Sequence, residues 1–146
     1  MEFTHKPVLL GPCIEALRIH PDGIYVDGTL GRAGHSREIA QRLTTGRLIC
    51  IDRDQAAIEA ARERLAPWLD RVTLVRSNFS ELGDVLRQAG VSGADGMLFD
   101  LGVSSPQLDD ASRGFSYMQD APLDMRMDTS AALSAYEVVN TWSQEE

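Results

Sequence analysis

The sequence has few of the residues that mark membrane, secreted or metal-binding proteins. Its 146 residues include two cysteines and three histidines, and neither kind has the spacing of metal ligands. No apolar run approaches the ~20 residues of a membrane span, and the chain does not open on a signal peptide. We therefore expect a cytoplasmic protein with two buried thiols, Cys13 and Cys50, with no metal site and no membrane partner.

Basic residues are also scarce. The 14 Lys and Arg stand against 22 Asp and Glu, which gives a formal net charge of −8. An extended phosphate-binding face is therefore not expected on this chain alone.

What is present is a regular alternation of short apolar runs and amphipathic segments. Strands are expected over 23–28, 47–52, 72–77 and 95–102, and helices over 11–19, 35–43, 55–69 and 80–90. The run RLICID at 47–52 is typical of a strand that is covered on both faces. This alternation predicts an α/β, Rossmann-like fold with a doubly wound parallel sheet, of which the chain would hold strands one to four.

The periodicity stops after Gly102. Residues 103–130 are predicted to form a loop without regular structure, folded back over the carboxyl ends of the strands. Ser134 and Glu137 form a capping box that opens a helix at 135–140, and Thr141 with Gln144 forms a second one. We therefore expect a first domain over 1–130 and the start of a helical domain over 131–146.

The turn DGTLGRAGH at 27–35 is the first pointer to function. Gly28, Gly31 and Gly34 are spaced three apart, so the turn matches neither the dinucleotide fingerprint nor the phosphate loop. A strand, a glycine turn and a helix start still offer unpaired N–H groups to a ligand. Asp27 would repel a pyrophosphate but would suit an amino group or a sulfonium.

Two further strands end in residues that suit an adenosine. Asp52 ends the second strand, where an acid accepts hydrogen bonds from both ribose hydroxyls. Asn78 and Phe79 follow the third strand and offer a polar group and a flat apolar face to the adenine. An adenosine with an amino group and a sulfonium is S-adenosylmethionine. NAD is disfavoured by the glycine spacing.

Four stretches together resemble one bacterial family of rRNA methyltransferases, the MraW or RsmH family. They are HKPVLL, GIYVDGTLGRAGHS, ICIDRD and LFDLGVSSPQLDDASRGFSYMQDAPLDMRMD. The resemblance implies a class I S-adenosylmethionine-dependent methyltransferase that methylates N4 of a cytosine in the decoding region of 16S rRNA. It implies small-subunit rRNA or the small ribosomal particle as partner. It also implies that about half of the enzyme is missing here.

The resemblance also implies which residues contact the cofactor. They are Ala33, Gly34, His35, Asp52, Phe79, Asp100 and Gln107; reasoning from the residues adds Asp27, Gly31 and Asn78. The family usually has a glycine at the position of Ala33, so a positive φ there would strain this chain. For His35, the alternative is an ordinary first-turn helix residue that faces solvent.

Methyl transfer to an exocyclic amine needs an acceptor for the amine proton. The candidates for catalysis are Asp100, Ser105 and Pro106, although SSPQ only loosely resembles the S-P-P-aromatic motif of amino-group methyltransferases. The alternative is a module that binds the cofactor without turnover. With only four strands, the fourth would expose an unpaired apolar edge, which predicts self-association.

Contacts to RNA are predicted from the long segment and from a few arginines. Phe115 or Tyr117 would stack on an extruded base, or else anchor the loop to the core. Arg32, Arg113 and Arg126 are the expected phosphate contacts on this chain, with most of the basic surface in the missing half.

Overall fold

The computed structural model describes residues 7–145, so the first two residues of the HKPVLL stretch lie outside the described part. The chain divides into two compact units, Met1–Asp100 and Leu101–Glu146. The predicted domain boundary at residue 130 stays a prediction.

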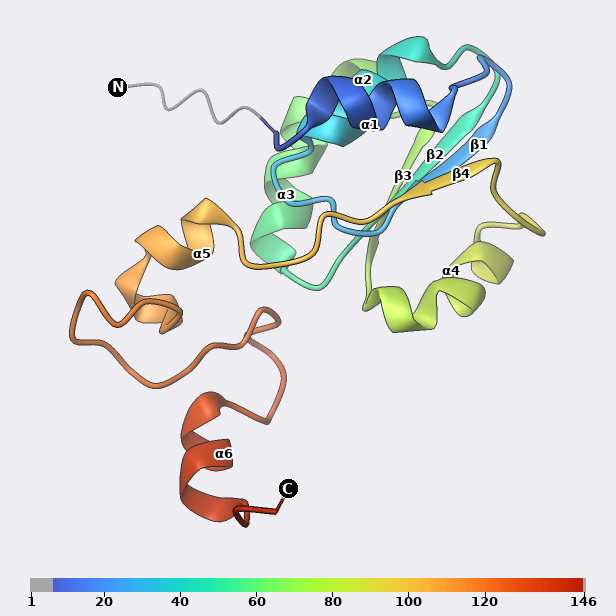
Figure 1. The fold of residues 1–146 in the computed structure, drawn as a ribbon. Helices are drawn as coiled ribbons and strands as arrows, with labels where there is room; N and C mark the ends of the chain where they lie inside the picture. Colours follow the sequence, from blue (N-terminus) through green and yellow to red (C-terminus); the bar gives the residue numbers. More distant parts are fainter. Residues whose placement is uncertain (1–6, 146) are drawn as a thin grey trace. The chain divides into compact units, whose positions relative to one another are not determined.

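The first unit is built on a parallel sheet in the order β3-β2-β1-β4 (Figure 1). Its strands are β1 (Ile24–Asp27), β2 (Arg47–Asp52), β3 (Val72–Arg76) and β4 (Gly96–Leu98). The predicted parallel sheet of four strands is confirmed. The fourth strand is much shorter than the expected 95–102, because Leu98 already pairs with Asp27, the last residue of β1.

Helices cover both faces of this sheet. They are α1 (Leu10–Leu17), α2 (Gly34–Arg42), α3 (Gln55–Arg64) and α4 (Leu82–Gln88). One core cluster joins Leu48 of β2 to residues of α2 and α3, and the other joins Ile49 to Val85 of α4. Because neighbouring residues of β2 point to opposite faces, its continuous apolar run belongs to a strand buried on both sides. Cys50 is buried as expected, whereas Cys13 is only half-buried.

Two helices end earlier than predicted. Helix α3 ends at Arg64, and a separate turn η1 (Ala66–Trp68) follows, because Pro67 lacks the N–H that would continue the helix. Helix α2 ends at Arg42, one residue before the expected end at Leu43. Gly46, which follows it, allows two chain segments to approach closely, since a Cβ there would lie 2.3 Å from the carbonyl oxygen of Gly23.

The second unit contains α5 (Ser105–Asp109), η3 (Ala111–Arg113) and α6 (Ala135–Thr141). The prediction that residues 103–130 lack regular structure is therefore wrong at the start of that segment, where α5 lies. The sequence pattern shows no sign of this helix, because five residues are too few to show a helical period of apolar residues. The capping box of Ser134 and Glu137 is confirmed. The second predicted capping box, of Thr141 and Gln144, is wrong, because Thr141 ends α6 and its hydroxyl donates to the carbonyl of Glu137 at 2.6 Å.

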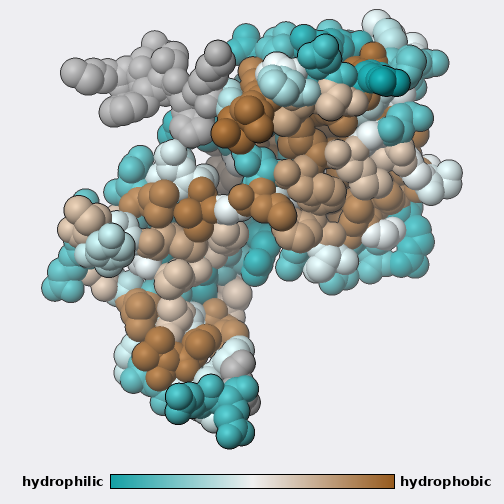
Figure 2. Space-filling model, viewed as in Figure 1, coloured by the Kyte–Doolittle hydropathy of each residue, from teal (hydrophilic) through white to brown (hydrophobic). Residues whose placement is uncertain are grey.

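Apolar side chains also reach the surface of each unit (Figure 2). In the first unit Phe79, Met97 and Phe99 are each 41% exposed, and in the second Tyr117 is 96% exposed. No helix among residues 7–145 is long and apolar enough to cross a membrane.

Candidate functional site

The glycine turn after β1 is held between the carboxyl ends of two neighbouring strands. The backbone N–H of Gly28 donates to the carbonyl of Leu98 in β4 at 2.9 Å, and that of Leu30 donates to Ile51 in β2 at 3.0 Å. Because the sheet is parallel, the carboxyl ends of its strands meet at one edge, where open α/β sheets bind ligands.

Asp52 lies directly against this turn. Its Oδ2 accepts the backbone N–H of Gly31 at 2.8 Å, and its Oδ1 accepts that of Asp54 at 2.9 Å. Gly31 has φ +48°, a left-handed conformation that glycine adopts readily. Each carboxylate oxygen keeps a further lone pair, and Asp52 is only half-buried. The structure thus brings two predicted site residues, Gly31 and Asp52, together. It leaves the carboxylate of Asp52 able to accept hydrogen bonds from two neighbouring hydroxyl groups.

Asp27 is turned into the protein and is only 1% exposed. Its Oδ1 accepts the backbone N–H of Thr29 at 3.1 Å, and its Oδ2 accepts the hydroxyl of Ser36 at 2.6 Å. Burial raises the pKa of Asp27, and the hydrogen bond from Ser36 opposes that rise. In this conformation the carboxylate would act on a ligand through its field rather than by contact. Sequence reasoning missed Ser36.

Ala33 carries the strain that a positive φ implies. It has φ 58° and ψ 25°, the left-handed region, as the N-cap residue of α2. Its methyl group is 1% exposed and lies in the core cluster with Leu30 and Ile39. The residue therefore combines an unfavourable backbone with a buried methyl group.

Gly34 and His35 hold the start of the described chain against this turn. A Cβ on Gly34 would lie 2.1 Å from Cγ of Pro7, so only glycine allows the approach. His35 is 6% exposed, and its Nε2 lies 3.0 Å from the carbonyl oxygen of Val8. The alternative of a solvent-facing His35 is therefore wrong.

Two aromatic rings lie at the same edge of the sheet. Phe79 begins η2 (Phe79–Glu81) after β3, and Phe99 follows β4; their centroids are 5.7 Å apart at 74°. Asn78 caps this turn, with its Oδ1 accepting the N–H of Ser80 at 3.1 Å. Phe99 was not identified from the sequence. Its signal was Gly28, on which a Cβ would lie 2.2 Å from the ring of Phe99.

Asp100 is exposed at the end of the first unit. Its backbone N–H donates to the hydroxyl of Thr29 at 2.6 Å, which links it to the glycine turn. Among residues 7–145 its carboxylate accepts no hydrogen bond. An exposed carboxylate of this kind is chemically able to accept a proton from a bound amine.

The remaining predicted site residues belong to the second unit. Ser105 and Pro106 are the first two residues of α5, and Gln107 is buried in its capping box, with Oε1 accepting the N–H of Ser104 at 3.0 Å. The placement of these residues at the cofactor site stays a prediction.

Two of the three arginines expected to contact RNA have hydrogen-bond partners within the second unit, and their contacts to RNA stay a prediction. Arg126 bonds both carboxylate oxygens of Asp124, at 2.9 and 2.7 Å, and lowers the pKa of Asp124 to about 2. Arg113 donates to the carbonyls of Arg126 and Met127. Tyr117 is almost fully exposed, so the alternative that it anchors the loop is wrong. Phe115 is half-buried.

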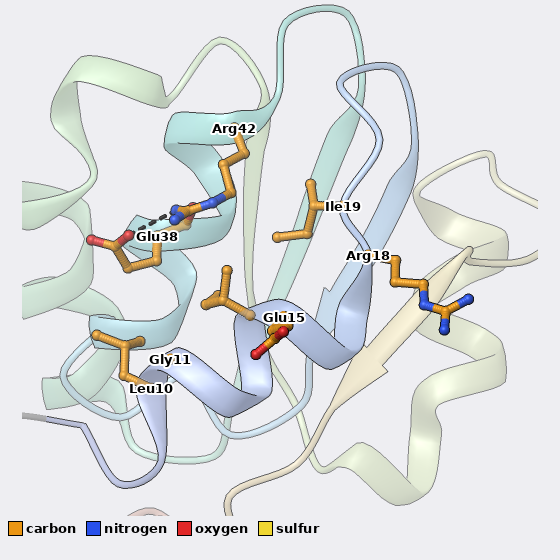
Figure 3. A pocket seen from close by; sticks show the side chains of 8 residues that line it. Leu10, Gly11, Glu15, Arg18, Ile19, Glu38 and Arg42 are labelled. Carbon is orange, nitrogen blue, oxygen red and sulfur yellow. Dashed lines mark hydrogen bonds and ion pairs between the residues drawn. The ribbon is translucent and has the colours of Figure 1, made fainter.

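A groove of about 720 Å³ lies elsewhere in the first unit, between α1 and α2 (Figure 3). Leu10, Ile14 and Ile19 supply its apolar surface, and an ion pair of 2.7 Å joins Arg42 to Glu38 at its side. None of the predicted site residues lines it.

The fold resembles those of solved methyltransferases. A SAM-dependent O-methyltransferase from Thermotoga maritima has a TM-score of 0.55 at 15% identity, covering 66% of this chain and 37% of that one. The precorrin-6y C5,15-methyltransferase of Geobacter metallireducens GS-15 has a TM-score of 0.54 at 20% identity, covering 68% and 50%. The fold class of this chain is thus the Rossmann-like α/β fold that these methyltransferases have.

The particular family follows from the sequence comparison. Residues 2–146 match the model of the MraW methylase family, and the chain belongs to that family. It is 59% identical over 147 residues to the ribosomal RNA small subunit methyltransferase H of Brevibacillus brevis, and 56% identical over 147 residues to that of Clostridioides difficile. Each match covers 100% of this chain and 47% of the relative, so the chain spans about half the length of these curated relatives.

Proposed function

We propose that this chain is the cofactor-binding part of a methyltransferase that transfers a methyl group from S-adenosylmethionine to N4 of a cytosine in the decoding region of 16S rRNA. The observation that carries the proposal is the bond from Gly31 to Asp52, which sets an acid beside a glycine turn at the carboxyl edge of the sheet. Membership of the MraW methylase family supports the same assignment. The partner would be small-subunit rRNA or the small ribosomal particle in the cytoplasm.

The cofactor would lie along this edge. Asp52 would accept from the ribose hydroxyls, and Phe79 would cover the adenine face, with the amide of Asn78 at its edge. Gly31 and the segment Ala33–His35 would line the methionine end. The family resemblance adds Gln107 as a proposed cofactor contact.

S-adenosylmethionine, when bound, supplies a methyl group on a positively charged sulfur. The in-line transfer chiefly requires alignment of the acceptor amine and its separation from water. Asp100 would accept the amine proton, and Thr29 holds the backbone of Asp100 against the turn that binds the methyl donor. Ser105 and Pro106, at the start of α5, would border the acceptor base.

Calorimetric titration with S-adenosylhomocysteine tests the cofactor site. Asp52→Ala removes the acceptor for the ribose and for Gly31, and we expect at least about a tenfold loss of affinity, as for a hydrogen bond to a charged group. Asp52→Asn keeps one acceptor oxygen and should lose less. Asp70→Ala is the control, because Asp70 precedes β3 at the opposite end of the strands. Equal affinities for the Asp52 variants and the control would overturn the site.

A second candidate function is binding of the cofactor without turnover. It is favoured by β4, which pairs only with β1 among the described strands and has Met97 half-exposed. Such an edge invites another chain, so we propose self-association, although an edge of three residues offers few hydrogen bonds. A monodisperse monomer in light scattering would contradict self-association. Methylation of small-subunit particles with labelled cofactor distinguishes turnover from binding.

Recognition of rRNA would depend mainly on the part of the relatives that this chain does not span. The chain carries a net charge of −8, and Arg113 and Arg126 are bound to neighbouring groups, which leaves Arg32 as the remaining predicted contact. We expect the 146-residue chain to bind naked rRNA far more weakly than a full-length relative does. Equal affinities would contradict this division of roles.

A further inference from the structure

Three side chains form a buried row beneath the glycine turn. Asp27 of β1 is 1% exposed, and Ser36 of α2 and Cys50 of β2 are both 0% exposed. The hydroxyl of Ser36 donates to Oδ2 of Asp27 at 2.6 Å and lies 3.2 Å from Sγ of Cys50. The row therefore crosses three elements and ends at the acid that begins the turn.

The chemistry of the three groups gives the row a direction. An ionised carboxylate only accepts hydrogen bonds, so the single proton of Ser36 points to Asp27. Burial and the nearby charge of Asp27 raise the pKa of the Cys50 thiol well above its usual range. Cys50 therefore keeps its proton and can donate to the oxygen of Ser36.

We propose that Ser36, oriented by Cys50, is a positioning residue of the cofactor site that keeps Asp27 ionised, so that the site prefers the cationic sulfonium of S-adenosylmethionine to the neutral thioether of S-adenosylhomocysteine. The inference rests on the proposed function. It concerns the charge at the site rather than the contacts that hold the adenosine.

The surroundings of Asp27 explain why it needs this support. It is removed from water, which favours the neutral acid, and within the described range 7–145 the hydrogen bonds from Ser36 and from the N–H of Thr29 oppose that effect. The charged groups that face it are His35 of α2, which lowers its pKa, and Asp52 of β2, which raises it. Without the hydroxyl, the bond from Thr29 and the nearby His35 would remain to favour the carboxylate.

The test measures the affinities of the 146-residue chain for both ligands by calorimetry over a series of pH values that begins at the ordinary carboxyl pKa of 3.8 and rises from there, because the pKa of Asp27 is raised. In the wild-type chain the preference for S-adenosylmethionine should fall as the pH drops through the pKa of Asp27. In Ser36→Ala the midpoint of that fall should move up by about one pH unit, since a hydrogen bond to a charge is equivalent to about tenfold. Cys50→Ala should move it in the same direction by less.

A matched control separates charge from stability. Ala40→Gly changes another fully buried residue of α2, so it should lower stability and leave the midpoint where it is. If Ser36→Ala does not fold, Cys50→Ala decides by the same midpoint, together with the pKa of Asp27 read from its carboxyl carbon by NMR. An unchanged midpoint and pKa would overturn the inference while the proposed function stands. A wild-type chain that binds neither ligand would instead overturn the proposed function.

Discussion

The substitution Ala33→Gly changes the stability of the protein through two opposing effects, relief of backbone strain and loss of a buried methyl group. Ala33 has φ 58° and ψ 25°, where a side chain is unfavourable. The strain alone suggests that glycine would stabilise the protein. The burial of the methyl group suggests the opposite.

The magnitudes nearly cancel. Glycine relieves a left-handed strain of about 1–2 kcal/mol. Two effects lower the stability of the glycine variant. The lost burial of one methyl group costs about 0.8 kcal/mol, and the greater conformational entropy of the unfolded chain costs a further ~0.4–1 kcal/mol. The expected change in the free energy of unfolding is therefore within about 1 kcal/mol of zero. Alanine is tolerated here because its one methyl group packs in the core.

Urea unfolding followed by circular dichroism measures this difference directly. Ala33→Val is the contrasting variant, because a β-branched residue is an outlier at positive φ and overfills the site, which should cost more than about 2 kcal/mol. A gain of more than about 2 kcal/mol for Ala33→Gly would show that the methyl packing contributes nothing. A comparable loss would show that the strain is absent.

Three further substitutions change the buried acid, the glycine turn and the second unit, and the same unfolding assay measures each. Burial raises the folded-state pKa of Asp27 above its ordinary value of 3.8, so ionisation costs stability at high pH; Asp27→Asn should be more stable than wild type at neutral pH, with the difference vanishing as the pH falls below 3.8. An advantage that persists at low pH would contradict this. Gly34→Ala should lose about 1–3 kcal/mol because its Cβ would meet Pro7, and an unchanged stability would argue against that packing. Asp124→Asn should weaken the second unit by about 1 kcal/mol, measured also as faster limited proteolysis, because the bonds from Arg126 lose their charge. Since the pKa of Asp124 is lowered to about 2, that contribution is present above pH 3.8 and is lost as the pH falls through about 2.

The sheet was predictable from the sequence because its strands depend on local patterns. The apolar run of β2 reflects burial on two faces, and the parallel order follows from the alternation with helices. The ends of elements depended on tertiary partners instead. Strand β4 stops at Leu98 because β1 has ended, and α5 is too short to show a helical period.

The places of Asp52 and the glycine turn in the fold were predictable from the sequence, but their contacts were not. Asp52 and the glycine turn could be placed at one edge because both follow parallel strands. The inward turn of Asp27 and the role of Ser36 depend on the packing of α2 against β1, which leaves no trace in the spacing. The packing of Pro7 and Val8 over Gly34 and His35 likewise joins segments far apart in the chain.

A paired calorimetric titration of the 146-residue chain with S-adenosylhomocysteine and with NAD shows directly whether the carboxyl edge of the sheet binds the methyl donor's adenosine. We expect saturable binding of one S-adenosylhomocysteine per chain and no binding of NAD, because the glycine turn and Asp52 suit an adenosine without a pyrophosphate. Binding of NAD, or no binding of S-adenosylhomocysteine, would contradict this expectation.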